Sequence, residues 1–307
     1  MSAAPQVTVF SCWYNRMEGL EESVRSILDQ TGVELEYIIV DDASTDGTAE
    51  RLQAIRDPRL RVLRNPQNIG FVRSANRAVR AGVGHYVAVH GAGDISLPGR
   101  LERQVAFLDR NSRAVAVGVG VESHNLVSGR RYRLDSTQGE KDELRYTYSH
   151  GEVMFRRAPF EQVGGYREIF YYTQDKDLWH RLSEHGELGL IEELLYHRRV
   201  TEDGVAQDPV KIARQAIFSN LMMHSAAERR HGRPDPVARY HALALLTQPG
   251  TERFRRRMRR LIRELLKKGE IRQARAALET APVGMLSSGE LGLLLALRGM
   301  TAFRRGT

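Results

Sequence analysis

The segment YIIVDDASTDGT (Tyr37–Thr48) joins an apolar run to a polar turn. The aromatic and β-branched residues Tyr37–Val40 predict a strand. Two aspartates end this strand, and Ser44 or Thr45 in the following turn can cap a helix. In an open α/β sheet, ligands bind beyond the carboxyl ends of the strands. The segment therefore predicts a strand, a loop that faces a ligand and a helix, in that order.

The same alternation extends in both directions from this segment. Further strands are predicted at Val7–Tyr14, Arg59–Asn65 and His85–Gly93, and helices at Glu18–Gln30, Val72–Val83 and Arg100–Asn111. Strand and helix alternating at this pace predict an α/β fold with a mostly parallel, doubly wound sheet flanked by helices. Right-handed crossovers would gather the carboxyl ends of these strands on one edge. Three polar segments that follow these strands are expected to lie close together there: Tyr14–Asn15, Asp41–Asp42 and Gly91–Asp94.

The last third of the chain has a different character. Strands are predicted at Ala114–Ser123 and Gly151–Arg157, and a helix begins near Gln174, but helical patterns dominate from Pro209 onward. We place a boundary near Asp208. The sequence thus predicts an α/β domain at residues 1–208 and a basic helical region at residues 209–307.

Composition limits the functional classes. The chain has 307 residues and a net charge of +8, which favours anionic partners such as nucleotides or an acidic membrane surface. Its single cysteine cannot form an internal disulfide and indicates a reducing compartment. The start MSAAPQVTVF lacks the pattern of a signal peptide, and no apolar run approaches the roughly 20 residues of a membrane span. We expect a cytoplasmic protein or one at the inner face of the membrane.

A series of motifs now matches a known family. VTVFSCWYN, SVRSILDQT, YIIVDDASTDGT, NPQNIGFVRSANRAV, GDISLPGRLERQV, VMFRRAPFEQVGGYRE and TQDKDLWHRL occur in the family's order between Val7 and about Val205. The chain resembles the family 2 glycosyltransferases, inverting enzymes of the Rossmann-like GT-A fold that use nucleotide sugars. One such motif would be weak evidence, whereas the whole ordered series is specific. The C-terminal third matches no family that we can name.

The resemblance implies a nucleotide site at the first two of these polar segments, Tyr14–Asn15 and Asp41–Asp42. Asp42 would accept a hydrogen bond from N3–H of a uracil-type base, because an ionised carboxylate only accepts, while Asp41 would be structural. Tyr14 and Asn15 would line the base and ribose, with Tyr14 stacking on the base. The structural alternative is that the two aspartates cap a turn and that Tyr14 is a core aromatic.

Two further residues are candidates for the nucleotide. Arg73 and Asn76 are three residues apart and so share one face of a predicted helix. Arg73 could reach the base or a phosphate, or it could be one of many solvated surface arginines. Gly165, within the motif VGGY, would let the backbone approach the acceptor closely, and a simple turn is the alternative.

The loop HGAGDISLP (His90–Pro98) departs from the family pattern. Metal-dependent members carry two aspartates around one residue here, often followed by a third acid. Aligned on ISLP, these positions are Gly91, Gly93 and Asp94. Mn²⁺ and Mg²⁺ need oxygen ligands, and glycine offers none from a side chain. His90 could be a substitute ligand or a structural histidine.

Three interpretations of this loop stay open. Transfer could proceed without a tightly held metal, with arginine, lysine or helix N-termini balancing the diphosphate charge. Mn²⁺ or Mg²⁺ could instead be held weakly, by Asp94 and mostly by the diphosphate. Or the site could be degraded, so that the domain only binds. In each of the first two, Gly93 and Asp94 would lie beside the nucleotide.

Asp175 is the expected catalytic base. The family carries an acidic pair before a DLW helix, and here the pair reads Gln174–Asp175. A carboxylate within hydrogen-bond reach can take the proton of the acceptor hydroxyl. Asp177 is the fallback, and either acid could instead stabilise the helix N-terminus. Trp179 is expected in the core or on the acceptor floor.

A closing segment of the family often ends with a histidine near the metal. Thr201 occupies that place here, after Arg198-Arg199-Val200. Arg199 could contact the diphosphate and supply part of an ion's charge.

Residues 251–268 form a basic amphipathic pattern. Apolar side chains fall on one stripe and arginines and lysines on the rest, as on helices that lie on anionic membranes. The alternative is a helix packed on a neighbour with a solvated charged face. We do not expect nucleic-acid binding, because no recognised nucleic-acid-binding fold accompanies the charge.

The sequence therefore predicts an inverting glycosyltransferase of hexosyltransferase type. It would move a sugar from a nucleotide-diphosphate sugar, UDP-sugar being favoured, to a hydroxyl of a glycan or lipid-linked acceptor in cell-surface glycan assembly. The alternative is a catalytically degraded protein that binds nucleotide sugars or acts as a scaffold. The motifs name neither the donor sugar nor the acceptor or linkage.

Overall fold

The computed structural model describes residues 5–126, 128–136, 144, 146, 148–200 and 208–303. The chain divides into two compact units. An α/β unit comprises Met1–Glu168 and Leu178–Thr201, and a helical unit comprises Ile169–Asp177 and Glu202–Thr307. The domain boundary predicted near Asp208 stays a prediction. Among the described helices, none has the length and apolar character needed to cross a bilayer.

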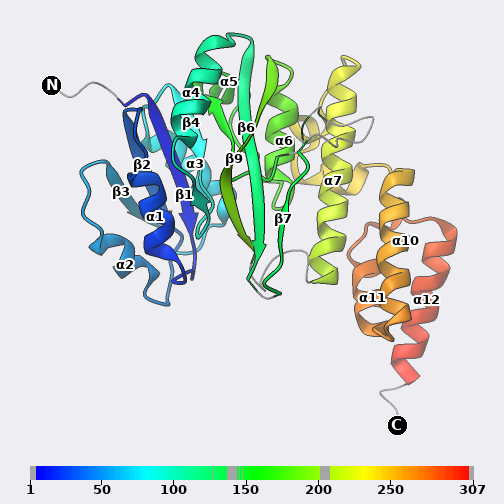
Figure 1. Cartoon of the computed structure of the whole chain (residues 1–307). Helices are drawn as coiled ribbons and strands as arrows, with labels where there is room; N and C mark the ends of the chain where they lie inside the picture. The colour runs from blue at the N-terminus through cyan, green and yellow to red at the C-terminus, as the bar shows by residue number, and fades with distance from the viewer. Residues whose placement is uncertain are drawn as a thin grey trace. The chain divides into compact units, whose positions relative to one another are not determined.

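The α/β unit is built on one mixed sheet, drawn in Figure 1. Its strand order is β3-β2-β1-β4-β8-β6-β9-β5, with β7 paired to β6. The strands are β1 (Val7–Trp13), β2 (Leu35–Asp41), β3 (Leu60–Arg64), β4 (Tyr86–Val89), β5 (Ile95–Ser96), β6 (Ala114–Asn125), β7 (Arg131–Arg133), β8 (Met154–Arg156) and β9 (Glu187–Val200). Strands β1 to β4 pair in parallel, as the sequence predicted. Beyond β4 the sheet is mixed, since β8 is antiparallel to β4 and to β6, while β9 is parallel to β6 and antiparallel to β5.

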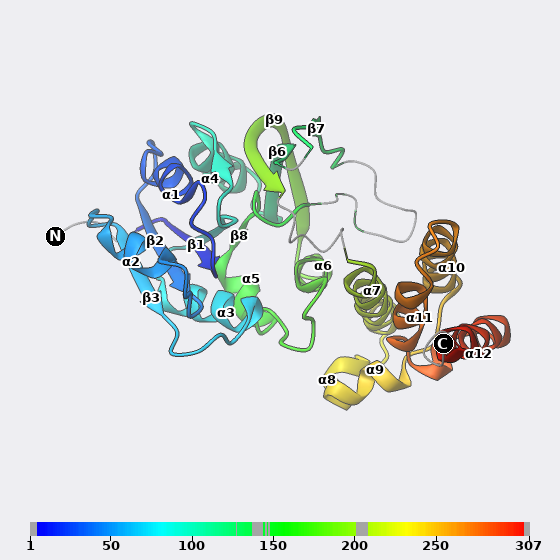
Figure 2. The ribbon, with the colours of Figure 1, turned by 90° about the horizontal axis from the view of Figure 1, so that it is seen from below.

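Helices cover both faces of this sheet. Alternate residues of β1 point to opposite faces, so Val9 enters a core shared with α1 and α4, while Phe10 enters a core shared with α3 and α6. Figure 2 shows α1 and α4 on one side of the strands and α3 and α5 on the other. The helices are α1 (Leu20–Leu28), α2 (Thr48–Ala54), α3 (Phe71–Ala81), α4 (Arg100–Arg110), α5 (Arg157–Gln162) and α6 (Gln174–Leu182), and α6 crosses the division between the units.

The helical unit has its own apolar core. Its elements are α7 (Pro209–Arg230), α8 (Pro236–Tyr240), η2 (His241–Leu243), α9 (Ala244–Thr247), α10 (Glu252–Lys267), α11 (Ile271–Glu279), η3 (Val283–Met285) and α12 (Ser288–Phe303). Asp208 caps α7, with Pro209 at the first helical position, and Thr251 caps α10. Helices α7, α10, α11 and α12 share one core.

Helix α10 contains the basic amphipathic pattern. Its apolar stripe is buried in the core of the helical unit, with Phe254, Met258 and Ile262 each at most 3% exposed. This is the packed arrangement that the sequence left as the alternative. Because that stripe is covered, α10 cannot lie on a membrane by inserting its whole apolar face. A membrane contact through 251–268 stays a prediction.

Candidate functional site

Asp94 is the centre of the loop that follows β4. Its Oδ2 accepts a hydrogen bond from the Tyr196 hydroxyl at 2.8 Å, and its Oδ1 accepts one from the backbone N–H of Arg199 at 2.8 Å. Both partners lie on β9, which pairs with β5 immediately after the loop. Burial raises the pKa of Asp94 above its usual value, while these two hydrogen bonds and the charges of Arg16 and Arg198 oppose the rise.

Glycines make room for this carboxylate. A Cβ at Gly91 would lie inside the van der Waals distance of Asp94 Oδ2, and a Cβ at Gly151 would do the same to the Tyr196 hydroxyl. Gly93 has φ +85°, and a Cβ there would be 2.9 Å from Nε of Arg16. The side-chain space beside Gly91 is thus occupied by Asp94, and that beside Gly93 by Arg16.

His90 and Arg100 are buried residues that hold the loop in place. The His90 ring is 1% exposed, and its nitrogens lie 3.1 Å from Ser23 Oγ and 3.2 Å from Ser96 Oγ. Burial, and then the charge of Arg100, lower the pKa of His90 to about 3, so the ring is neutral at ordinary pH. With both nitrogens in hydrogen bonds, His90 takes the structural role.

Arg100 is fully buried and ties three backbone segments together. Its guanidinium donates to the carbonyls of Val89 and Gly151, at 2.7 and 3.0 Å, and to Ser96 Oγ at 2.7 Å. It also lies 4.8 Å from the centre of the Tyr196 ring. Desolvation lowers the pKa of Arg100. These contacts fix the end of β4, where the loop begins.

Asp42 organises the neighbouring loop. Its Oδ1 accepts from Asn65 Nδ2 at 2.6 Å and from Ile69 N–H at 2.9 Å, and its Oδ2 accepts from Gly70 N–H at 2.8 Å. Each carboxylate oxygen has two lone pairs, so Oδ2 can accept one more hydrogen bond. Asp42 is 4% exposed, and its predicted contact with a base stays a prediction.

Tyr14 and Asn15 follow β1 with different environments. Tyr14 is 51% exposed, so it is not the core aromatic of the structural alternative. Asn15 adopts φ 47°, donates its N–H to Ser44 Oγ at 3.0 Å and accepts from Thr45 N–H at 2.8 Å. Asn15 thus anchors the loop after β2, and Tyr14 is the side chain available for stacking.

Arg73, Asn76 and Gly165 meet on the α3 side of the sheet. Arg73 pairs with Glu168 at 2.8 Å on the surface. The Asn76 amide donates to the Tyr166 carbonyl at 2.8 Å and accepts from the Tyr166 N–H at 3.0 Å. Gly165 has φ +72°, and a Cβ there would lie 2.8 Å from Asn76 Oδ1. Protein contacts account for these side chains, and their roles toward a ligand stay predictions.

Sequence reasoning missed His150. This residue has φ +93°, a strained value for a side chain larger than glycine. Its Nε2 lies 2.8 Å from the Tyr166 hydroxyl, and its ring contacts those of Phe71 and Trp179. Trp179 is 1% exposed in the same core, and its indole N–H has no hydrogen-bond partner. In the sequence, the one feature that could have drawn attention to this residue is a histidine directly before a glycine, Gly151.

Asp175 lies in the first turn of α6 and is half-buried. Trp179 is four residues later and therefore on the same face of the helix. Asp177 is fully buried, and its backbone N–H bonds the carbonyl of Thr173. Both acids suit a helix N-terminus. Thr201, where the family often has a histidine, lies outside the described residues.

Three arginines surround the Asp94 loop. Arg199 pairs its guanidinium with Glu22 at 2.5 Å, and its predicted contact with the diphosphate stays a prediction. The Arg16 guanidinium lies beside Gly93 and reaches the Arg199 carbonyl at 3.5 Å. Arg198 shares a face of β9 with Tyr196, and its buried Nε has no partner. Arg16 and Arg198 both place positive charge near the Asp94 carboxylate.

The loop does not offer the ligand set of a tightly held divalent ion. Gly91 and Gly93 lack ligating side chains, so Asp94 is the acid that the loop offers, and each of its oxygens already shares one lone pair with a hydrogen-bond donor. Within the described residues, no three His, Cys, Asp or Glu side chains are grouped to hold a metal. The residues present therefore do not fit such an ion.

Comparisons with known proteins find glycosyltransferase relatives. The model of the family described as glycosyl transferase family 2 matches residues 8–164. EpsE of Bacillus subtilis (strain 168), named as a glycosyltransferase, is 33% identical over 211 residues, covering 66% of this chain and 76% of EpsE. The succinoglycan biosynthesis protein ExoO of Rhizobium meliloti is 33% identical over 134 residues, covering 43% of this chain and 37% of ExoO.

Solved structures share the fold. The mannosyltransferase PcManGT from Pyrobaculum calidifontis, in complex with GDP-Man and Mn²⁺, aligns with a TM-score of 0.56 at 19% identity, covering 98% of this chain and 81% of that one. S. aureus TarS 1–349, in complex with UDP-GlcNAc, aligns with a TM-score of 0.60 at 15% identity, covering 98% and 92%. These likenesses confirm the GT-A fold that the motifs predicted.

Proposed function

The chain belongs to glycosyl transferase family 2, and from that premise we propose that it transfers a sugar from a UDP-sugar to an acceptor hydroxyl with inversion. The observation that carries the proposal is the arrangement of Asp42 and Asp94 beyond β2 and β4, the two strands that flank β1, with cations beside Asp94. TarS, a structural neighbour, is complexed with UDP-GlcNAc, and ExoO acts in succinoglycan biosynthesis. The TarS complex supports a UDP-sugar donor. ExoO supports an acceptor in cell-surface glycan assembly, either a glycan or a lipid-linked sugar.

The nucleotide would lie along the carboxyl edge of β1, β2 and β4. Tyr14 would stack on the base, and Asp42 would accept from its N3–H through the capacity left on Oδ2. Asp42 is positioned for this by the backbone N–H groups of Ile69 and Gly70, which fix the carboxylate. The surface arginine Arg73 could release Glu168 to meet a phosphate, because exposed ion pairs are weak.

The diphosphate would meet arginines in place of a tightly held metal. Arg16 lies beside Gly93, and Arg198 brings a buried, unpartnered Nε to the same loop. Charge-assisted hydrogen bonds from guanidinium groups can balance a leaving diphosphate. Asp94 would act as an organiser, since it holds β9 against the loop through Tyr196 and Arg199. Any Mn²⁺ or Mg²⁺ would take most of its ligands from the nucleotide.

Asp175 would be the base. The acceptor oxygen attacks the anomeric carbon from the face opposite the nucleotide, its proton passes to the Asp175 carboxylate, and the bond from the anomeric carbon to the diphosphate oxygen breaks. UDP leaves with that bond's electron pair. Asp175 lies in the first turn of α6, a position that favours acidic side chains because of the helix dipole.

The test replaces the base and leaves the nucleotide site intact. Asp175→Asn should lower kcat by about 10² to 10⁴-fold, the usual worth of general-base catalysis, with UDP affinity and the thermal midpoint unchanged. Lys176→Gln, a change at the adjacent half-buried position, is the matched control and should keep its activity. Unchanged turnover in Asp175→Asn would reject Asp175 as the base. UDP binding with no turnover of any donor in the unsubstituted protein would favour a degraded, binding-only domain.

A further inference from the structure

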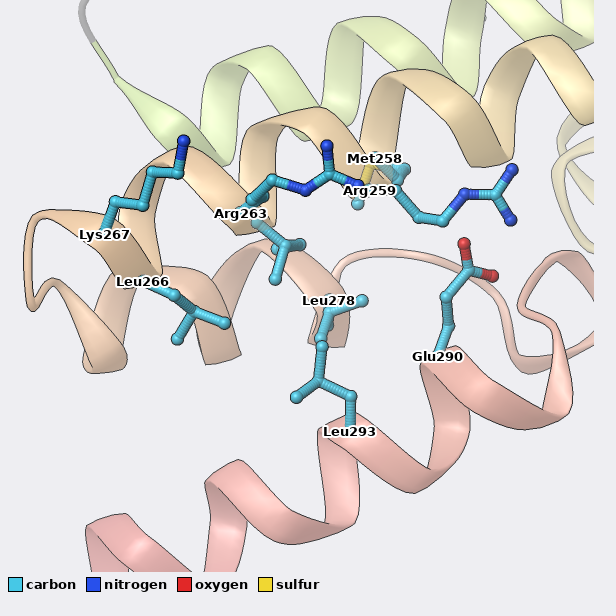
Figure 3. A pocket seen from close by; sticks show the side chains of 9 residues that line it. Met258, Arg259, Arg263, Leu266, Lys267, Leu278, Glu290 and Leu293 are labelled. Atoms are coloured by element: carbon cyan, nitrogen blue, oxygen red, sulfur yellow. The ribbon is translucent and has the colours of Figure 1, made fainter.

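A pocket in the helical unit lies outside the site described above. It has a volume of about 510 Å³ and is lined by residues of α10, α11 and α12 (Figure 3). Its apolar lining consists of Met258, Ile262, Leu266, Leu278 and Leu293, and its polar lining consists of Arg259, Arg263, Lys267 and Glu290. The pocket therefore combines a hydrocarbon floor with a rim of three cations and one acid.

Two of the rim cations have no counter-charge. Arg263 and Lys267 are four residues apart on one face of α10, both exposed, and neither makes an ion pair within the part of the chain that the structure describes. Like charges at this spacing repel. Arg259 differs, because it pairs with Glu252. An anion at Arg263 and Lys267 would relieve their repulsion.

Glu290 contributes an unused acceptor. It is 6% exposed, and its Oε2 accepts from the N–H and the hydroxyl of Ser287, each at 2.8 Å. Its Oε1 is buried without a hydrogen-bond partner. Figure 3 shows the carboxylate reaching from α12 into the pocket. A buried acceptor without a donor is unfavourable, so a ligand that carries hydroxyls as well as an apolar part, as a phospholipid with a glycerol headgroup does, would gain a hydrogen bond here.

We propose that this pocket binds the hydrocarbon chain of an anionic phospholipid, with the phosphate at Arg263 and Lys267. The apolar floor excludes a free inorganic anion as the best occupant, because such an anion would leave that surface uncovered. The volume falls in the range of about 300 to 1,000 Å³ that is typical of small-molecule sites, which favours a lipid chain over a partner's helix.

The pocket also resolves how a basic region with a covered apolar stripe can meet a membrane. Insertion of the whole α10 face is prevented by packing in the core. A single lipid chain entering between α10 and α12 needs no such exposure. This inference does not rest on the proposed sugar transfer, because it concerns a separate site with its own ligand.

The first test separates the pocket from general charge. The full chain would be titrated with vesicles of phosphatidylglycerol mixed with phosphatidylcholine, and with phosphatidylcholine alone. R263E/K267E should weaken binding to the anionic vesicles by about tenfold or more, since each basic residue near an anionic surface contributes about 1 kcal/mol. The matched control is R256E/R260E, which makes the same charge change on exposed positions of α10 outside the pocket.

The second test addresses the lipid chain. Leu293→Trp fills the pocket without changing charge, and Leu295→Trp places the same side chain at a 67% exposed position of the same helix. Leu293→Trp should weaken the binding of 11-(dansylamino)undecanoic acid, a fluorescent fatty acid probe, and should also weaken binding to the vesicles. Leu295→Trp should change neither affinity. Equal losses in the two charge variants, or full probe binding by Leu293→Trp, would overturn the proposal. So would equal binding to both kinds of vesicle.

Discussion

Gly91 and Asp94 share a single side-chain space. The carboxylate of Asp94 turns back over Gly91, where it meets the Tyr196 hydroxyl, and Gly91 N–H donates to that same hydroxyl at 2.9 Å. Gly91 and Gly93, the two positions where metal-dependent members of the family carry aspartates, thus belong to one loop that packs around Asp94. Their identity was plain in the sequence, but the use of the freed space by Asp94 was not.

Returning the family's aspartate to position 91 should destabilise the protein. In Gly91→Asp the new Cβ would collide with Asp94 Oδ2 and bring a second carboxylate into a buried site. We expect a loss of about 2 kcal/mol or more in the free energy of unfolding, measured with urea. Gly284→Asp, where a Cβ meets nothing within 4 Å, is the control and should lose little. A Gly91→Asp protein as stable as the original would show that the loop is not packed as described.

The neutral, buried His90 predicts a stability that depends on pH. Its pKa is lowered from 6.5 to about 3 in the folded state, so the unfolded chain takes up a proton first as pH falls. The resulting stability is fully present above about pH 6.5 and is lost as pH falls toward 3. His90→Gln should flatten the pH dependence of unfolding in that window, measured by urea titrations at several pH values. Parallel curves for the two proteins would contradict this assignment.

At the scale of elements, local pattern predicted the first four strands and the helices between them. Their alternation is a property of short segments, and β1 to β4 lie in parallel as expected. The pattern did not predict β9, because Glu192 and Glu193 interrupt its apolar residues. The structure explains the interruption, since the pairing of β6 with β9 shifts register around Gly120. Missing β9 also meant missing Tyr196 and Arg198.

Gly120 should therefore be essential to that pairing. A Cβ at this position would lie 2.6 Å from the carbonyl oxygen of Glu193, a backbone atom that cannot move aside easily. Gly120→Ala should cost about 1 to 3 kcal/mol in the free energy of unfolding. Because β9 carries the partners of Asp94, nucleotide affinity should fall in the same variant. Wild-type stability in Gly120→Ala would argue against the register shift, and Gly284→Ala, whose surroundings are open, controls for the loss of a glycine.

At the scale of the whole molecule, contacts between residues far apart in the sequence determine the features of the site that local sequence patterns could not predict. Asp94 meets residues more than a hundred positions later in the chain, and no local pattern announces such a contact. The stripe of α10 was visible in the sequence, whereas its burial depended on α7, α11 and α12. The alternation of elements did indicate where β1, β2 and β4 end, and five of the predicted nucleotide residues follow these ends: Tyr14, Asn15, Asp42, Gly93 and Asp94. The other two, Arg73 and Asn76, lie on α3. The net charge of +8 suits both proposed anionic ligands, a nucleotide sugar and a phospholipid.

The central claim is that arginines, and not a protein-held metal, balance the charge of the nucleotide diphosphate. It is tested most directly by calorimetric titration of UDP, with GDP as the comparison nucleotide, in excess Mn²⁺ and in EDTA. We predict that UDP binds in both conditions with dissociation constants within about threefold, which corresponds to about 0.6 kcal/mol, and that Arg16→Gln weakens both equally. UDP binding that requires Mn²⁺ would contradict the account, since an ion and not the arginines would then balance the diphosphate charge.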